Sequence, residues 1–139
     1  MTNKQELLDI LNRAFVEKYN SLAAYILAAH PYVAEGQEHM LSVVQEIADQ
    51  DQIMCQELAQ TIENLNGVPR TGPHDEMVSE LNFLAIDYLV KTLAEQLQNQ
   101  IEQHEEVLEK ISDSEEAQRR ILQVKDATSA QLEQLRKLN

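Results

Sequence analysis

The sequence predicts an all-α protein built as a bundle of four helices, and three observations carry this prediction. Apolar residues recur at spacings of three and four along most of the chain, which is the period of an amphipathic helix. The 139 residues include only three glycines and three prolines, too few for the turns of an all-β fold. These six residues fall in two short segments, 31–36 and 67–73, which divide the chain into helical blocks. We expect one domain, residues 1–139.

The first helix is expected over residues 3–30. Thr2 and Gln5 have the spacing of a capping box at its start. One face then carries a stripe at helical spacing, and the charged residue Lys18 stands in the same line. The other members of the stripe are Leu7, Leu11, Ala14, Ser21, Leu22, Tyr25 and Ala28.

The second helix is expected over residues 37–66, and Gly67 stands where a C-terminal cap belongs. Its apolar stripe also contains one charged residue, Asp51. Only a short loop separates this helix from the first, so the two are expected to pack antiparallel. The apolar members of the stripe are Leu41, Val44, Ile47, Ala48, Met54, Cys55, Leu58, Ile62 and Leu65.

The third helix is expected over residues 75–111 and the fourth over residues 114–138. The third is apolar on nearly every face over residues 81–90, so its pattern is less simple. Ser112 and Glu115 have the spacing of a capping box before the fourth helix. Four long amphipathic helices in a chain of this length predict a four-helix bundle.

The chain is strongly acidic, with 24 Asp and Glu against 11 Lys and Arg and a net charge of -13. This field repels phosphate backbones and anionic lipids, so we expect neither nucleic acid nor membrane partners. One cysteine permits no internal disulfide and no Cys-based zinc motif. The first residues lack the apolar stretch of a signal peptide, and no run approaches the roughly 20 apolar residues of a membrane span. A cytoplasmic location is therefore expected.

Two groups of residues resemble members of the ferritin-like superfamily. Leu11 and Asn12, followed by Tyr25 in the same block, are similar to the first helix of bacterioferritin. Residues 59–69 carry an A-x-x-I-x-x-L stripe that runs into L-x-G-x-P, which resembles the end of the second helix in bacterioferritin- and rubrerythrin-like proteins. The later blocks fit the same length pattern, so the resemblance extends over nearly the whole chain. It implies a ferritin-like four-helix bundle.

The same resemblance implies where a centre of two iron or manganese ions would lie. In such a centre one Glu comes from each of two helices and an E-x-x-H pair from each of the other two. This chain contains no E-x-x-H. Carried over residue by residue, the ligand positions fall on Lys18, on Asp51 and Met54, on Ala94, and on Lys125 and Thr128, or on Ala127 and Ala130 without a gap.

Of these positions, Asp51 alone retains a metal ligand, and the ammonium of Lys18 repels cations. We therefore expect a vacated centre, with no metal, no cofactor and no catalytic residue. The sequence favours a non-catalytic structural or interaction module. The alternative is an iron-binding oxidoreductase or ferroxidase-type protein, using iron or manganese held by atypical ligands drawn from Asp51, Glu17, Glu46, Glu95 and His104.

Simpler interpretations apply to most of those alternative ligands. Glu17, Glu95 and Asp126 stand beside inward positions and are expected at the surface. Asp49 lies off the apolar stripe, so Glu46 and Asp49 are expected on a solvated face. His104 is expected to be a partly exposed histidine, and Cys55 and Tyr25 are expected to be core residues.

Lys18 and Asp51 are expected to face each other. If the first two helices form an antiparallel pair, facing residue numbers sum to roughly 69, and 18 and 51 satisfy this rule. A charge on an apolar stripe is costly without a partner, so we expect an ion pair with a polar contact from Thr128. The alternative is that Lys18 extends its stem outward and places its ammonium in water.

Self-association is also expected, most simply as a two-fold dimer, and another protein is the second kind of partner that the sequence allows. The first and third helices carry apolar residues away from their core stripes, and we expect that a single bundle core is too small to bury them all. Contiguous apolar surface that stays exposed usually marks an interface. These residues are Leu8, Phe15, Tyr19, Leu22, Ile26, Phe83, Ile86 and Val90.

Overall fold

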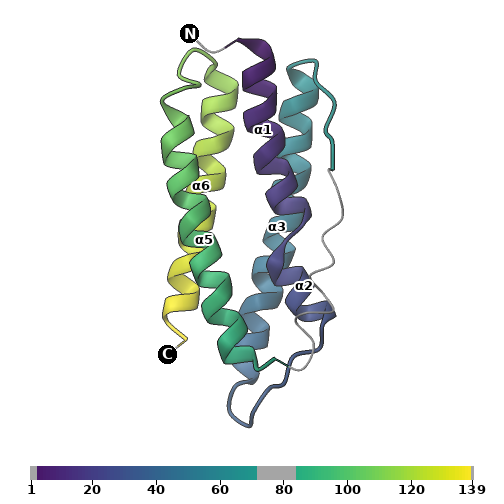
Figure 1. Cartoon of the computed structure of the whole chain (residues 1–139), viewed down its shortest axis with the longest axis vertical. Helices are drawn as coiled ribbons and strands as arrows, with labels where there is room; N and C mark the ends of the chain where they lie inside the picture. The colour runs from purple at the N-terminus through teal and green to yellow at the C-terminus, as the bar shows by residue number, and fades with distance from the viewer. Residues whose placement is uncertain (1–2, 72–83, 139) are drawn as a thin grey trace.

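The computed structural model describes residues 3–71 and 84–138, and the regular structure of this part of the chain is helical, without a strand. α1 and α2 follow one another along one rod, so the described residues form four rods that pack side by side (Figure 1). The all-α class and the four-helix arrangement are confirmed. The helices are α1 (Lys4–Tyr19), α2 (Leu22–Ala28), α3 (Glu38–Asn64), α5 (Ile86–Leu108) and α6 (Glu115–Arg136).

A break at Asn20 and Ser21 divides the first rod, so the expectation of one continuous helix over residues 3–30 is wrong. Ser21 has a ψ of 120° and caps α2, because its Oγ accepts a hydrogen bond from the Ala24 N–H at 3.3 Å. Asn and Ser side chains compete with the helical backbone for such hydrogen bonds. The break also turns the buried face: Ala23 and Ile26 are fully buried, Tyr25 is half-buried and Ala28 is exposed.

Two of the predicted helix caps lie at different residues. α1 begins after Asn3, whose Oδ1 accepts from the Glu6 N–H at 2.8 Å, whereas Thr2 lies outside the described residues. α6 begins after Ser114, whose Oγ accepts from the Ala117 N–H at 3.4 Å. Ser112 therefore does not cap α6, and Ser114 takes the N-cap position two residues later.

Gly67 lies one residue beyond the left-handed residue that ends α3, and it packs closely against α1. Asn66, not Gly67, adopts the left-handed conformation, with a φ of 65°. The Gly67 N–H donates to the Ile62 carbonyl at 2.9 Å, which completes a Schellman-type end. A Cβ at Gly67 would lie 2.7 Å from Leu8 Cδ2, so glycine permits the chain to cross closely over α1.

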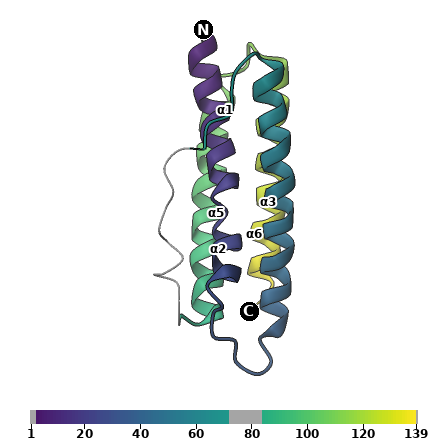
Figure 2. The same ribbon diagram turned by 90° about the vertical axis from the view of Figure 1, so that its right-hand side faces the viewer.

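Helices α3 and α5 begin at the same end of the bundle. Tyr32 in the loop before α3 forms an isolated parallel bridge with Ala85, the N-cap of α5. The Tyr32 N–H donates to the Leu84 carbonyl at 3.1 Å, and the Ile86 N–H donates to the Tyr32 carbonyl at 2.8 Å. α3 and α5 therefore run in the same direction, while α6 returns antiparallel to α5 (Figures 1 and 2). The predicted third helix also included residues 75–83, which lie outside the described part.

Two apolar clusters form the core, one at each end of the bundle. The cluster near α2 includes Ile26, Ile47, Leu89, Leu93 and Leu97, all at most 2% exposed. The cluster near the start of α1 includes Leu11, Leu58, Ile111, Ile121 and Val124, again at most 2% exposed. None of the helices among the described residues is both long enough and apolar enough to cross a bilayer.

The core buries most of the additional apolar residues that motivated the dimer. Phe15, Leu22 and Ile26 on the first rod, and Ile86 and Val90 on α5, are at most 7% exposed. The assumption that one core could not bury these residues is wrong: Leu22 and Ile26 face inward after the break before α2, and Ile86 and Val90 lie in the same apolar cluster on the inward face of α5. Of the remaining residues, Leu8 is half-buried, Tyr19 is 50% exposed, and Phe83 lies outside the described part. The dimer itself stays a prediction.

Candidate functional site

A layer of buried polar side chains lies between the two apolar clusters. Every rod of the bundle contributes to this layer, and each member is at most 7% exposed. Buried polar groups are costly unless they bond to one another, so their pairing defines what the layer can do. Its members are Lys18, Ser21, Asp51, Gln100, His104, Thr128 and Gln131.

Lys18 Nζ lies at the centre of the layer. It is 3.7 Å from Asp51 Oδ1, and it donates to Thr128 Oγ1 at 3.1 Å and to Gln100 Oε1 at 3.3 Å. The Lys18 side chain is 1% exposed, which rules out the alternative of an ammonium extended into water. The predicted ion pair with Asp51 and the contact with Thr128 are confirmed.

Asp51 uses both carboxylate oxygens inside the layer. Its Oδ2 accepts from Ser21 Oγ at 2.7 Å, and its Oδ1 accepts from Gln131 Nε2 at 3.1 Å. Ser21 thus connects the helix break to the centre of the bundle, since it also caps α2. Burial lowers the pKa of Lys18, and Asp51 and then Glu17 oppose this shift. The three partners of the ammonium compensate for much of its lost hydration.

A second buried pair lies next to Lys18 and was not expected. His104 is 4% exposed, and its Nε2 is 3.5 Å from Glu17 Oε2, whose side chain is 19% exposed. Glu17 Oε2 and both ring nitrogens of His104 have no hydrogen-bond partner among the described residues. Both residues line a cavity of about 50 Å³. The expectations of a surface Glu17 and a partly exposed His104 are wrong, because α5 turns His104 inward.

Burial shifts the two groups of this pair in opposite directions. It raises the pKa of Glu17 to about 7, and the nearby charges of Lys18 and Arg13 oppose that shift. It lowers the pKa of His104 to about 4, and Lys18 and Lys125 add to that shift. Between pH 4 and 7 both side chains are therefore mainly neutral.

The remaining family positions lie away from this layer. Met54 belongs to the apolar cluster near the start of α1, and Ala94 packs against the other cluster. Ala94 is thus the wrong α5 position for the central layer, since Gln100 stands beside Lys18 instead. Lys125 is 25% exposed and lies 3.8 Å from Glu105. For the gap-free register, Ala127 is half-buried and Ala130 is exposed.

The atypical ligand set is not brought together as a group. Glu46 and Glu95 are exposed, as are Asp49 and Asp126, in line with the surface positions expected for them. Cys55 and Tyr25 are half-buried against the core. Within the described ranges, no group of three or more His, Cys, Asp or Glu side chains is arranged to hold a metal ion.

The residues of the layer do not fit a di-metal centre. Such a centre needs several carboxylates and imidazoles whose lone pairs face the ions. The carboxylate of Asp51 already accepts hydrogen bonds from Ser21 and Gln131 and pairs with Lys18, and the ammonium of Lys18 occupies the space that metal cations would need.

Comparison of the chain with protein-family models and with curated proteins finds no match in either case.

Proposed function

We propose that this protein is a ferritin-like bundle that has lost its di-metal centre and acts as a non-catalytic structural or interaction module in the cytoplasm. One observation carries the proposal. The Lys18 ammonium contacts one side chain from each of the other three rods, namely Asp51, Gln100 and Thr128. The positive charge at the centre of the bundle is therefore the ammonium of Lys18, which belongs to the chain itself.

The direction of the helices supports the ferritin-like part of this proposal. α3 and α5 run parallel, whereas α6 is antiparallel to α5 (Figures 1 and 2). Ferritin-like bundles contain such a parallel pair of helices. Because one fold supports several chemistries, it is the pairing of Lys18 with Asp51, and not the fold, that supports the loss of the di-metal centre.

Metal analysis and ferrous oxidation test the proposal. Protein purified without added metal should contain far less than one iron or manganese per chain. Ferrous iron added without oxygen, and then exposed to oxygen, should oxidise no faster than in buffer. About two metal ions per chain, or a saturable fast oxidation phase, would overturn the proposal.

A pair of charge-reversal variants isolates the role of the ammonium. Lys18→Glu places a second carboxylate beside Asp51, so it should increase binding of Fe²⁺ or Mn²⁺ over the wild type. Lys91→Glu makes the same charge change at an exposed position of α5 away from the layer, and it should have little effect. If both variants bind metal equally, net charge and not the central ammonium governs cation binding.

The alternative function, an iron-binding oxidoreductase with atypical ligands, has one observation in its favour. Glu17 and His104 supply a carboxylate and an imidazole 3.5 Å apart, and Glu17 Oε2 and both ring nitrogens of His104 have no hydrogen-bond partner in the described chain. Two ligands are fewer than the three or four that protein metal sites use, and Lys18 stands beside them. If metal does bind, Glu17→Gln and His104→Gln would each abolish it under the alternative function.

An interaction module also needs a partner, and a second copy of the chain is the first candidate. Large apolar side chains remain at the surface of the described residues: Tyr19, Tyr32, Ile53, Val68, Tyr88 and Leu122. Light scattering at micromolar concentration should give the mass of a dimer. A monomer mass would leave a different protein as the partner.

A further inference from the structure

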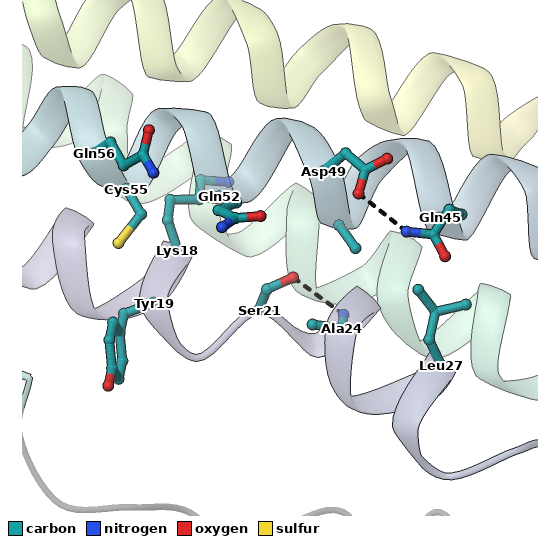
Figure 3. A pocket seen from close by; sticks show the side chains of 11 residues that line it. Lys18, Tyr19, Ser21, Ala24, Leu27, Gln45, Asp49, Gln52, Cys55 and Gln56 are labelled. Carbon is teal, nitrogen blue, oxygen red and sulfur yellow. Dashed lines mark hydrogen bonds between the residues drawn. The ribbon is translucent and has the colours of Figure 1, made fainter.

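A pocket of about 530 Å³ opens on the outer side of the seam between the first rod and α3. Figure 3 shows Tyr19 and Cys55 toward one end of this pocket and Leu27 and Gln45 toward the other. Its volume lies within the range of about 300–1,000 Å³ found for small-molecule sites. It is separate from the cavity beside Glu17 and His104, with which it shares no lining residue.

The helix break creates this pocket. Ser21 and Ala24, at the break and in the first turn of α2, are small residues, and Ala48 on α3 is small as well. Small side chains on both sides of the seam leave room where larger residues would fill it. Tyr19, which is 50% exposed, and Leu27 supply apolar surface on the first rod.

The polar groups of the pocket select the charge of a ligand. Two lining residues are charged, Lys18 and Asp49. Lys18 directs its ammonium into the core toward Gln100 and Thr128, so only its stem can touch a ligand. Asp49 is exposed at the rim, where its Oδ1 accepts from Gln45 Nε2 at 3.0 Å (Figure 3).

Two further rim residues can bond to a ligand. Gln52 and Gln56 are one helical turn apart on α3, and both are exposed. An amide offers both donors and an acceptor, so this wall accepts a polar group of either kind. The exposed carboxylate of Asp49 at the rim and the net charge of -13 favour a cation over an anion.

We propose that this pocket binds a small amphipathic cation, with its apolar body between Tyr19, Leu27 and Ala48 and its ammonium toward Asp49. The Coulomb energy between two unit charges about 6 Å apart in water changes the affinity of a ligand about threefold. Opposite charges raise the affinity and like charges lower it. A cation should therefore bind about tenfold more tightly than an anion of the same shape, and a neutral analogue should lie between them. The proposal is independent of the metal question.

Three indole compounds test the charge rule, because the chain contains no tryptophan and indole fluorescence then reports the ligand alone. Tryptamine is the cation, tryptophol the neutral analogue and indole-3-acetate the anion. The fluorescence anisotropy of tryptamine should rise with protein concentration and saturate, and the affinities should follow the order cation, neutral, anion. Equal affinities for all three, or no saturable binding of any, would overturn the proposal.

Matched variants place the binding in this pocket. Asp49→Asn should weaken tryptamine about threefold and leave tryptophol unchanged. Asp126→Asn changes the net charge equally at an exposed position of α6 and should change neither. Ala24→Phe places a ring in the pocket from an exposed position and should abolish both, with the urea midpoint as the check on folding. Binding that survives in a folded Ala24→Phe variant would overturn the proposal.

Cys55 gives a second readout within the same pocket. It is the only cysteine of the chain and lines the pocket, so saturating tryptamine should slow its reaction with methyl methanethiosulfonate. Tryptophol at equal occupancy should protect it as well, since both share the indole body. An unchanged rate at saturating tryptamine would show that the ligand lies elsewhere.

Discussion

Replacing Glu17 or His104 should reveal two pH dependences that oppose each other in the wild-type protein. Burial raises the pKa of Glu17 from 4.5 to about 7 and lowers that of His104 from 6.5 to about 4. Besides burial, the charges that act on the pKa are those of Lys18 and Arg13 for Glu17, and those of Lys18 and Lys125 for His104. Burial is the main cause of each shift, so we expect each shift to persist when the other residue is removed.

The signs of the two contributions follow from the protons bound in each state. Between pH 4.5 and 7 the folded state holds a proton on Glu17 that the unfolded state has lost, so stability falls as pH rises. Between pH 4 and 6.5 the unfolded state holds a proton on His104 that the folded state lacks, so stability rises with pH. A change in pKa from 4.5 to about 7, or from 6.5 to about 4, is worth about 3 kcal/mol, and the two contributions nearly cancel over the shared range.

The free energy of unfolding in urea, measured from pH 4 to 8, tests this cancellation. Relative to the wild type, Glu17→Gln should gain about 3 kcal/mol of stability as pH rises from 4 to 7, because the variant lacks the Glu17 contribution, which falls over that range in the wild type. His104→Gln should lose a similar amount over that range. Subtraction of the wild-type curve removes the titration of the other carboxylates. Parallel curves for all three proteins would refute the reasoning.

Two further predictions concern the central layer. Lys18→Met alone should destabilise the protein by about 3–5 kcal/mol, because Asp51 is left buried without its ion pair. Adding Asp51→Leu should restore much of that loss. Additive effects of the two single substitutions in a double-mutant cycle, measured by urea unfolding, would contradict the contact between the two side chains. Ser21→Ala removes both the cap of α2 and a hydrogen bond to Asp51, so it should cost about 2–4 kcal/mol. Ser114→Ala removes only a cap and should cost about 1 kcal/mol, and equal losses in thermal unfolding would argue against the link from Ser21 to the layer.

The sequence by itself determined the helices and the central ion pair. Helical spacing of apolar residues is a local property, and it identified the four rods before any packing was known. The facing of Lys18 and Asp51 followed as well, since a short loop between antiparallel helices sets their register. The sequence also contains a signal for the burial of His104, because Leu93, Leu97, Gln100 and His104 follow one another at spacings of four, three and four. Helical spacing alone, however, does not show whether a polar residue on such a stripe is buried.

Tertiary structure decided the level of α5, and it stabilised the break at Asn20 and Ser21, whose side chains also compete locally with the helical backbone. Neither residue is a glycine or proline, and the break is stabilised by a hydrogen bond from Ser21 to Asp51 on another helix, which local propensity does not contain. Ala94 was placed in the layer because the register of α5 was carried over from a resemblance. Twenty-one residues separate the end of α3 from the start of α5, so no short loop sets the axial position of α5 and packing decides it. Packing places Gln100 and His104 beside Lys18, and the sequence pattern of α5 by itself does not determine this axial position of the helix along the bundle.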